Sequence, residues 1–408
     1  MPEIRSITYF TDVFADDHRT PMARGGSFLS AARHALEKAG LIVQSLRLAT
    51  QPFPQHLFPR GPASMARTVQ QLHDLSRAFG VDYLSLGPIN PEDDPDYFYS
   101  LAEVIIHMPN MFASAAIADK DRGIDLATLY RAAEVISFLA DATSDGMKNL
   151  FFTAAANCPP WSPFFPVAYH GGGTHAFALA VQAADLANTI FAAANTPEDA
   201  RKNLTAAINA YTLQVVPVAK QIAEEHGVEF KGLDFSLAPY PVDDKSLGGA
   251  LEKLGPAFGG HGLVASASIV MNAIEAADFP SIGFSGLMLP ILEDSILGRR
   301  VVEDRLGMND LLLLSAVCGT GLDCIPLPGE ITNDQLYAIL LDVAALALRL
   351  DKPLTARLMP FPGKMAGDIV EFSFEYFTRS KILPAPPYTI DKTRPLGKAE
   401  GKFRISPR

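Results

Sequence analysis

The chain has 408 residues, of which 48% are hydrophobic and 19% are charged, a composition typical of soluble globular proteins. The formal net charge of −11 disfavours a nucleic-acid partner. Three cysteines at irregular spacing form neither a disulfide framework nor a zinc-binding pattern. Because the start of the chain is acidic and no apolar run reaches about 18 residues, we expect no signal peptide and no membrane span, and a cytoplasmic location.

The first half of the chain alternates predicted strands and helices. Strands are expected at 4–10, 42–49, 81–86 and 149–155, and helices at 27–38, 64–80, 97–106 and 126–140. The strands are too apolar to have a solvent-exposed face, so a mostly parallel sheet covered by helices is predicted. In the second strand, alternation places Arg47 on the face opposite to Leu46 and Leu48.

The second half is predicted to continue with helices and short strands. Thr196 followed by Pro197 is a strong helix start, and Thr332 with Gln335 forms a capping box. The helix that begins at Thr196 is expected to end near residue 211, a second one at 227, and the helix that begins at Thr332 near residue 350. A further helix is expected at 264–277, and strands at 230–237, 282–292, 355–359 and 369–372. Residues 379–408 hold 8 Lys or Arg against 2 Asp or Glu, which indicates an extended basic tail that lies on an acidic body or in solvent.

The stretch Leu311–Glu330 is the first candidate for chemistry. Two apolar runs flank the sequence Cys-Gly-Thr-Gly at 318–321, a pattern that predicts a hairpin. Its flanks are too apolar for water, so the turn is expected inside the protein, with Asp323 just after it. Cys318 is a candidate nucleophile or radical carrier, although a buried cysteine often only packs.

A glycine run preceded by a histidine is the second candidate. His170 comes directly before Gly171, Gly172 and Gly173, and His175 follows. Histidines around such a run are typical of metal or anion sites. The alternative is a histidine that is hydrogen-bonded within a loop, which we favour for His175. We take His170, or alternatively His261 in a later glycine-flanked stretch, as a proton carrier, and Gly171 and Gly172 as substrate contacts.

Polar side chains at strand ends form the third group. These are Asp234, Ser236, His261, Ser285, Glu293, Asp294 and Asp323. Parallel strands bring such ends to one rim, where α/β active sites lie. Several carboxylates there favour an acid–base pair or a divalent cation, with Glu293 and Asp294 as metal ligands. The alternative is that they cap helices and satisfy loop amides. Arg357 and Lys364 are candidate anion contacts. The alternative for Lys364 is a turn residue in solvent.

Eight segments resemble an uncharacterised family, domain of unknown function 711. They are IRSIT, VQSLRLAT, YHGGG, DFSLAP, GHG, FSGLMLPILED, AVCGTGLDCIPLPGE and PGKMAGDIVEF, which together span 4–372. The resemblance implies a fold similar to pyruvate formate-lyase: a closed α/β barrel of about ten strands, over residues 1–377, with a hairpin in its lumen. The tail would then cover 378–408. In those enzymes the inserted loop carries the active cysteine, a place that Cys318 would take here.

The resemblance brings no reaction with it. Residues 373–377, Ser-Phe-Glu-Tyr-Phe, stand where the family has a glycine-rich run, and no glycine lies in a radical-bearing motif. We therefore expect an enzyme that acts on a small polar or anionic metabolite around Cys318, without glycyl radical chemistry. One alternative is a non-catalytic metabolite-binding or assembly protein that acts through oligomerisation, and another is a scaffold that has lost radical chemistry. A homo-oligomer with the C-terminal tail at an interface is expected.

Overall fold

The computed structural model describes residues 2–14, 16–54 and 61–407 and has a large, mostly parallel sheet. The strand order is β8-β7-β1-β2-β3-β4-β6-β10-β9, with β5 and β13 beside β4. Neighbours along this order are parallel except at β1–β7 and β6–β10. The strands are β1 (Glu3–Phe10), β2 (Val43–Ala49), β3 (Tyr83–Ser85), β4 (Met111–Asp119), β5 (Gly123–Asp125), β6 (Phe152–Ala156), β7 (Ala176–Gln182), β8 (Glu229–Asp234), β9 (Gly321–Pro328), β10 (Leu354–Phe361) and β13 (Lys402–Phe403).

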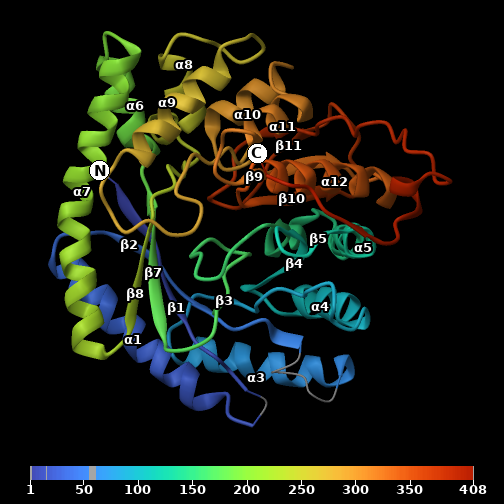
Figure 1. The fold of residues 1–408 in the computed structure, drawn as a ribbon, viewed down its shortest axis with the longest axis horizontal. Helices are drawn as coiled ribbons and strands as arrows, with labels where there is room; N and C mark the ends of the chain where they lie inside the picture. Colours follow the sequence, from blue (N-terminus) through green and yellow to red (C-terminus); the bar gives the residue numbers. More distant parts are fainter. Residues whose placement is uncertain (1, 15, 55–60, 408) are drawn as a thin grey trace.

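Helices form the outer layer around these strands (Figure 1). They are α1 (Arg19–Lys38), α3 (Met65–Ala78), α4 (Asp96–His107), α5 (Leu126–Asp141), α6 (Ala184–Ala193), α7 (Pro197–His226), α8 (Leu247–Lys253), α9 (Leu263–Glu275), α10 (Ser295–Val302), α11 (Met308–Ser315) and α12 (Asn333–Arg349). Both predicted caps are confirmed, since Thr196 accepts the amide of Asp199 and Thr332 forms its capping box with Gln335. The mixed α/β fold is therefore as predicted.

Barrel closure is not found in the part of the chain that the structure describes. The end strands β8 and β9 are not joined by a ladder. Irregular chain at 280–287 lies between them instead, where a strand was expected at 282–292. It accepts the amides of Leu233 and Leu237 at 2.8 and 2.9 Å, and Leu287 accepts the amide of Gly319 at 3.0 Å. The pyruvate formate-lyase-like barrel is not confirmed by this topology.

The two faces of the sheet pack against different partners. In β7, Phe177 and Leu179 belong to the large core with the helices, whereas Ala176 and Ala178 belong to a second cluster with Phe165. This inner face is covered by the irregular segment 157–175, at the centre of the molecule in Figure 1. The small alanine side chains leave room for that segment. They also explain why neither β7 nor the alanine-rich β4 was predicted, since alanine favours helices.

The predicted hairpin at Leu311–Glu330 is wrong. The first apolar run forms helix α11, and only the second forms a strand, β9. Short apolar runs fit a buried helix as well as a strand, so periodicity could not separate the two. The helix start is set by Asp310, whose carboxylate accepts the amide of Gly307 at 2.9 Å. The inner face of the sheet, where the Cys318 turn was expected, is covered by segment 157–175 instead.

The basic tail lies on its own chain. Its strand β13 pairs with β5, and Lys402 forms an ion pair with Asp125 at 3.2 Å. Earlier in the tail, the carbonyl of Leu396 accepts a hydrogen bond from Tyr337 of α12 at 2.6 Å. Among the helices described, none combines the length and apolar character needed to cross a membrane.

Candidate functional site

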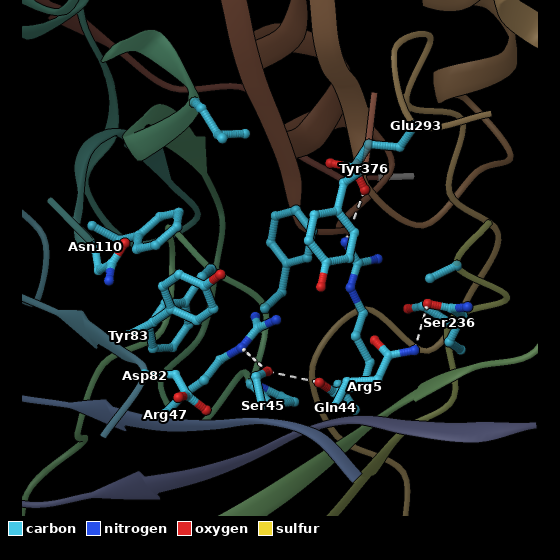
Figure 2. Close-up of a pocket in the computed structure, with 18 of the residues that line it drawn as sticks. Arg5, Gln44, Ser45, Arg47, Asp82, Tyr83, Asn110, Ser236, Glu293 and Tyr376 are labelled. Atoms are coloured by element: carbon cyan, nitrogen blue, oxygen red, sulfur yellow. Dashed lines mark hydrogen bonds and ion pairs between the residues drawn. The ribbon is translucent and has the colours of Figure 1, made fainter. Parts of the chain in front are cut away.

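A cavity of about 830 Å³ opens at one rim of the sheet (Figure 2). It lies at the amino ends of β1, β2, β3 and β4 and at the carboxyl ends of β7 and β8, because β7 runs antiparallel to β1. Its charged or amide-bearing lining residues are Arg5, Arg33, Gln44, Arg47, Arg77, Asp82, Asn110, Gln182, Asp234, Glu293 and Arg357. Aromatic residues make up much of the remainder. The size suits a metabolite.

A β-bulge directs Arg5 into this cavity. In the pairing of β1 with β7, Ile4 lies opposite Val181 and Ser6 lies opposite Ala180, which leaves Arg5 as the extra residue. Bulges re-aim side chains and are frequent next to active sites. Figure 2 shows the Arg5 side chain extending toward Glu293, and its Nη2 lies 2.8 Å from Glu293 Oε2.

Arg47 is a cation of the cavity wall without a carboxylate partner. Its guanidinium lies over the rings of Tyr83 and Phe165, at 5.6 and 5.2 Å from the ring centres. Its Nε donates to Ser45 Oγ at 3.0 Å, and none of the ion pairs within 2–14, 16–54 and 61–407 includes it. Burial and the nearby charge of Arg5 lower the pKa of Arg47 to about 9. The wall therefore holds an uncompensated positive charge.

Behind Arg5 lies a buried ionic network. Arg357 Nε lies 2.6 Å from Asp323 Oδ1, and Arg357 Nη2 lies 3.5 Å from Glu293 Oε1. Burial raises the pKa of Glu293, but the positive charges of Arg5 and Arg357 outweigh it and hold the pKa below its usual value. Glu293 is therefore ionised at neutral pH.

A second bulge builds this network. Asp323 and Cys324 of β9 together face Arg357 of β10, because Leu322 pairs with Ala356 and Ile325 with Leu358. Cys324 has a φ of 49° in the middle of a strand, a left-handed conformation that is rare for a side-chain-bearing residue and is concentrated at functional sites. Its thiol donates to Glu293 Oε1 at 3.4 Å.

The predicted metal ligands do not come together. The carboxylate of Asp294 caps α10 and also accepts the amides of Leu247 and Gly248 at 2.7 and 3.0 Å, as the helix-capping alternative expected. Ligand atoms of Glu293, Asp323 and Cys324 do lie within 4.8 Å of one another. Guanidinium donors already engage both carboxylates, so a cation would have to displace Arg5 or Arg357. This donor set fits arginine better than a metal ion.

Asp234 and its neighbours form another part of the cavity wall. Burial raises the pKa of Asp234, opposed by hydrogen bonds from Ser236 and from the amides of Phe284 and Ser285. These amides lie at 3.0 and 3.1 Å from its oxygens. Asp234 thus anchors the irregular segment after residue 280, with Ser285 as a wall support and Ser236 at the cavity surface.

The remaining predicted site residues lie outside the cavity lining. Cys318 is buried, and its sulfur accepts the amide of Gly321 at 3.3 Å. His170 is bound to Asp12, just beyond the carboxyl end of β1, so it lies at the opposite rim of the sheet from the cavity. Gly171, Gly172, His261 and Lys364 are exposed in loops or turns. The structure brings together Asp234, Ser236, Glu293 and Arg357 at the cavity, with Asp323 directly behind them.

A family model described as "Uncharacterised ACR (DUF711)" matches residues 1–375. The chain belongs to the DUF711 family. Relatives of this DUF711 protein are named UPF0210 proteins. One from Pyrobaculum aerophilum is 30% identical over 370 residues, which cover 86% of this chain and 81% of the relative. Another from Methanopyrus kandleri is 26% identical over 397 residues, which cover 93% and 87%.

The cavity residues that sequence reasoning missed are chiefly Arg5 and Arg47. Both lie in segments that carried the resemblance to DUF711, IRSIT and VQSLRLAT. A signal was present for Arg47, since an arginine that alternates with leucines in a buried strand needs a polar environment. No such signal existed for Arg5, because a bulge breaks the alternation at that residue. The aromatic residues Tyr240 and Tyr376 come from loops and gave no pattern.

Proposed function

We propose that this DUF711 protein binds a small organic anion in the cavity, with Arg47 as its main contact. The observation that carries the proposal is the guanidinium of Arg47, which lines the cavity without an ion-pair partner among the described residues. Arg47 is half-buried, and a charge that is partly withdrawn from water is stabilised by a counter-ion. A bound anion would supply the missing partner.

The arginines next to Arg47 in the inner wall are already paired. Arg5 and Arg357 face Glu293 and Asp323 at distances between 2.6 and 3.5 Å. Arg47 adds one further positive charge to these two pairs. Its ring contacts and its bond to Ser45 hold the guanidinium in place before a ligand arrives. Such preorganisation lowers the entropic cost of binding.

A catalytic role in converting that anion is the second candidate. It is supported by the unusual backbone at Cys324 and by an ionised Glu293 at the cavity surface, since strained backbone and buried charges are concentrated at active sites. Glu293, held ionised by Arg5 and Arg357, would stabilise positive charge that develops on the substrate, because its lowered pKa makes it a weak proton acceptor. A thiol nucleophile has less support, because Cys318 is buried away from the cavity lining.

The test of anion binding begins with mass spectrometry of small molecules released from the purified protein. The released anion is then titrated into the wild type, Arg47→Met and the control Arg201→Met by calorimetry. Arg201 is half-buried on α7, outside the cavity lining, and is paired with Glu198. Loss of a charge-assisted hydrogen bond predicts binding that is roughly 10- to 100-fold weaker for Arg47→Met and unchanged for Arg201→Met. Equal affinities in all three proteins would disprove the assignment.

Incubation with the same anion separates an enzyme from a binding protein. Appearance of a product that requires Glu293 supports catalysis, whereas saturable binding without a product supports a sensor. The predicted homo-oligomer with the tail at an interface is tested by sedimentation of the protein without residues 379–408. An unchanged mass would remove the tail from that role.

A further inference from the structure

We infer that the ligand of this cavity is a monoanionic aromatic carboxylate. The inference rests on the proposed anion site and names the chemical class that it takes. It is drawn from three features of the cavity: the kind of residue in its wall, the donors that Arg47 leaves free, and the balance of charge around Arg47.

The wall is strongly enriched in aromatic side chains. Eight of the 32 lining residues are Phe or Tyr, whereas aromatic residues make up 9% of the chain. Some of these rings already pair in the geometries that an aromatic guest would extend. The ring centres of Phe112 and Phe151 lie 4.9 Å apart, and those of Tyr240 and Tyr376, which meet edge to face, lie 5.8 Å apart. A planar aromatic body gains offset-stacked and edge-to-face contacts in such a wall.

The donors of Arg47 match a carboxylate. Its guanidinium carbon lies 5.6 and 5.2 Å from the ring centres of Tyr83 and Phe165, and its Nε donates to Ser45. Among the described residues, the two terminal nitrogens have no hydrogen-bond partner and remain for a ligand. Two oxygens of one carboxylate accept from such a fork in a bidentate arrangement.

The charge balance selects a single negative charge. Three guanidinium groups, of Arg5, Arg47 and Arg357, face the carboxylates of Glu293 and Asp323. Asp234 forms no ion pair with these arginines: it accepts bonds from two amides and a hydroxyl, and burial raises its pKa. One carboxylate completes the pairing around Arg47. A phosphate ester carries close to two negative charges at neutral pH, one more than Arg47 alone would pair.

The chemical class is tested with a matched set of probes on the full-length protein. They are 2-naphthylacetate, its fully saturated analogue, 2-naphthylacetamide and 2-naphthyl phosphate, each titrated by calorimetry. We expect 2-naphthylacetate to bind most tightly. The saturated analogue should be weaker by roughly two- to tenfold, from the loss of ring pairing. The amide should be weaker by at least about tenfold, from the loss of charge.

Variants separate a specific effect of the wall from general hydrophobic binding. Tyr376→Leu should reduce the preference for the naphthyl probe over its saturated analogue. Tyr99→Leu is the control, since Tyr99 is exposed on α4 and outside the cavity lining. Equal binding of the two carboxylates, with both sensitive to Arg47→Met, would overturn the aromatic class and leave the anion site intact. Tighter binding of the phosphate would overturn the monoanion. Failure of every naphthyl anion to bind, while the anion released from the purified protein does bind, would overturn the aromatic class alone.

Discussion

Removing the carboxylate of Asp323 should be among the most destabilising single changes in this protein. The side chains of Asp323 and Arg357 are 2% and 5% exposed, and their Oδ1 and Nε atoms lie 2.6 Å apart. Asp323→Ala leaves Arg357 buried with only Glu293 at 3.5 Å as a counter-charge. Breaking a buried pair from one side costs about 3–5 kcal/mol, because the remaining ion stays desolvated. We expect a loss of that size in the free energy of unfolding.

The assay is equilibrium unfolding in guanidinium chloride at pH 7, with Glu198→Ala as the matched control. Glu198 and Arg201 form a pair of nearly the same length, 2.7 Å, at the exposed surface of α7, so its loss should cost less than about 1 kcal/mol. The double replacement Asp323→Leu with Arg357→Met should recover much of the lost stability, because no lone charge remains. If Asp323→Ala costs no more than the control, water reaches Arg357 and the buried network is not as described.

Three further results are expected. The pKa of Glu293 is held below its ordinary value of 4.5, so its ion pairs stabilise the fold above that pH and lose this effect as the pH falls below it. The difference in unfolding free energy between wild type and Glu293→Gln should therefore shrink on acidification. A constant difference would contradict the pairing. Gly232→Ala should destabilise the protein by on the order of 1–3 kcal/mol in a thermal melt, because φ is 137° and the new Cβ would lie 2.3 Å from a carbonyl oxygen. Gly255→Ala is the control, at a φ of 117° with no atom near the new Cβ, and should cost less stability. The reverse order would refute the packing argument. Cys318 is 1% exposed, so mass spectrometry should find it alkylated by iodoacetamide only as the protein unfolds, and rapid labelling of the native protein would restore it as a candidate nucleophile.

Several elements were readable from the sequence because their signals are local. The capping residues Thr196 and Thr332 marked helix starts that the structure confirms. The apolar strands predicted a buried, mostly parallel sheet, and Asp234 at the end of β8 does face the cavity. Glu293 faces it too, although irregular chain precedes it where a strand was expected. Each of these signals depends on a residue and its neighbours within one or two turns, which is what propensity and alternation report.

The cavity's cation arrangement was decided only by tertiary structure. Bulges in β1 and β9 direct Arg5, Asp323 and Cys324 to one network, and a bulge depends on the register between two strands that lie far apart in the chain. The long segment 157–175 covers the inner face, because alanines on the opposing strands leave it space. Alternation along a single strand carries no information about its partner, so the sequence by itself determined the layers, and the fold alone determined which charges meet.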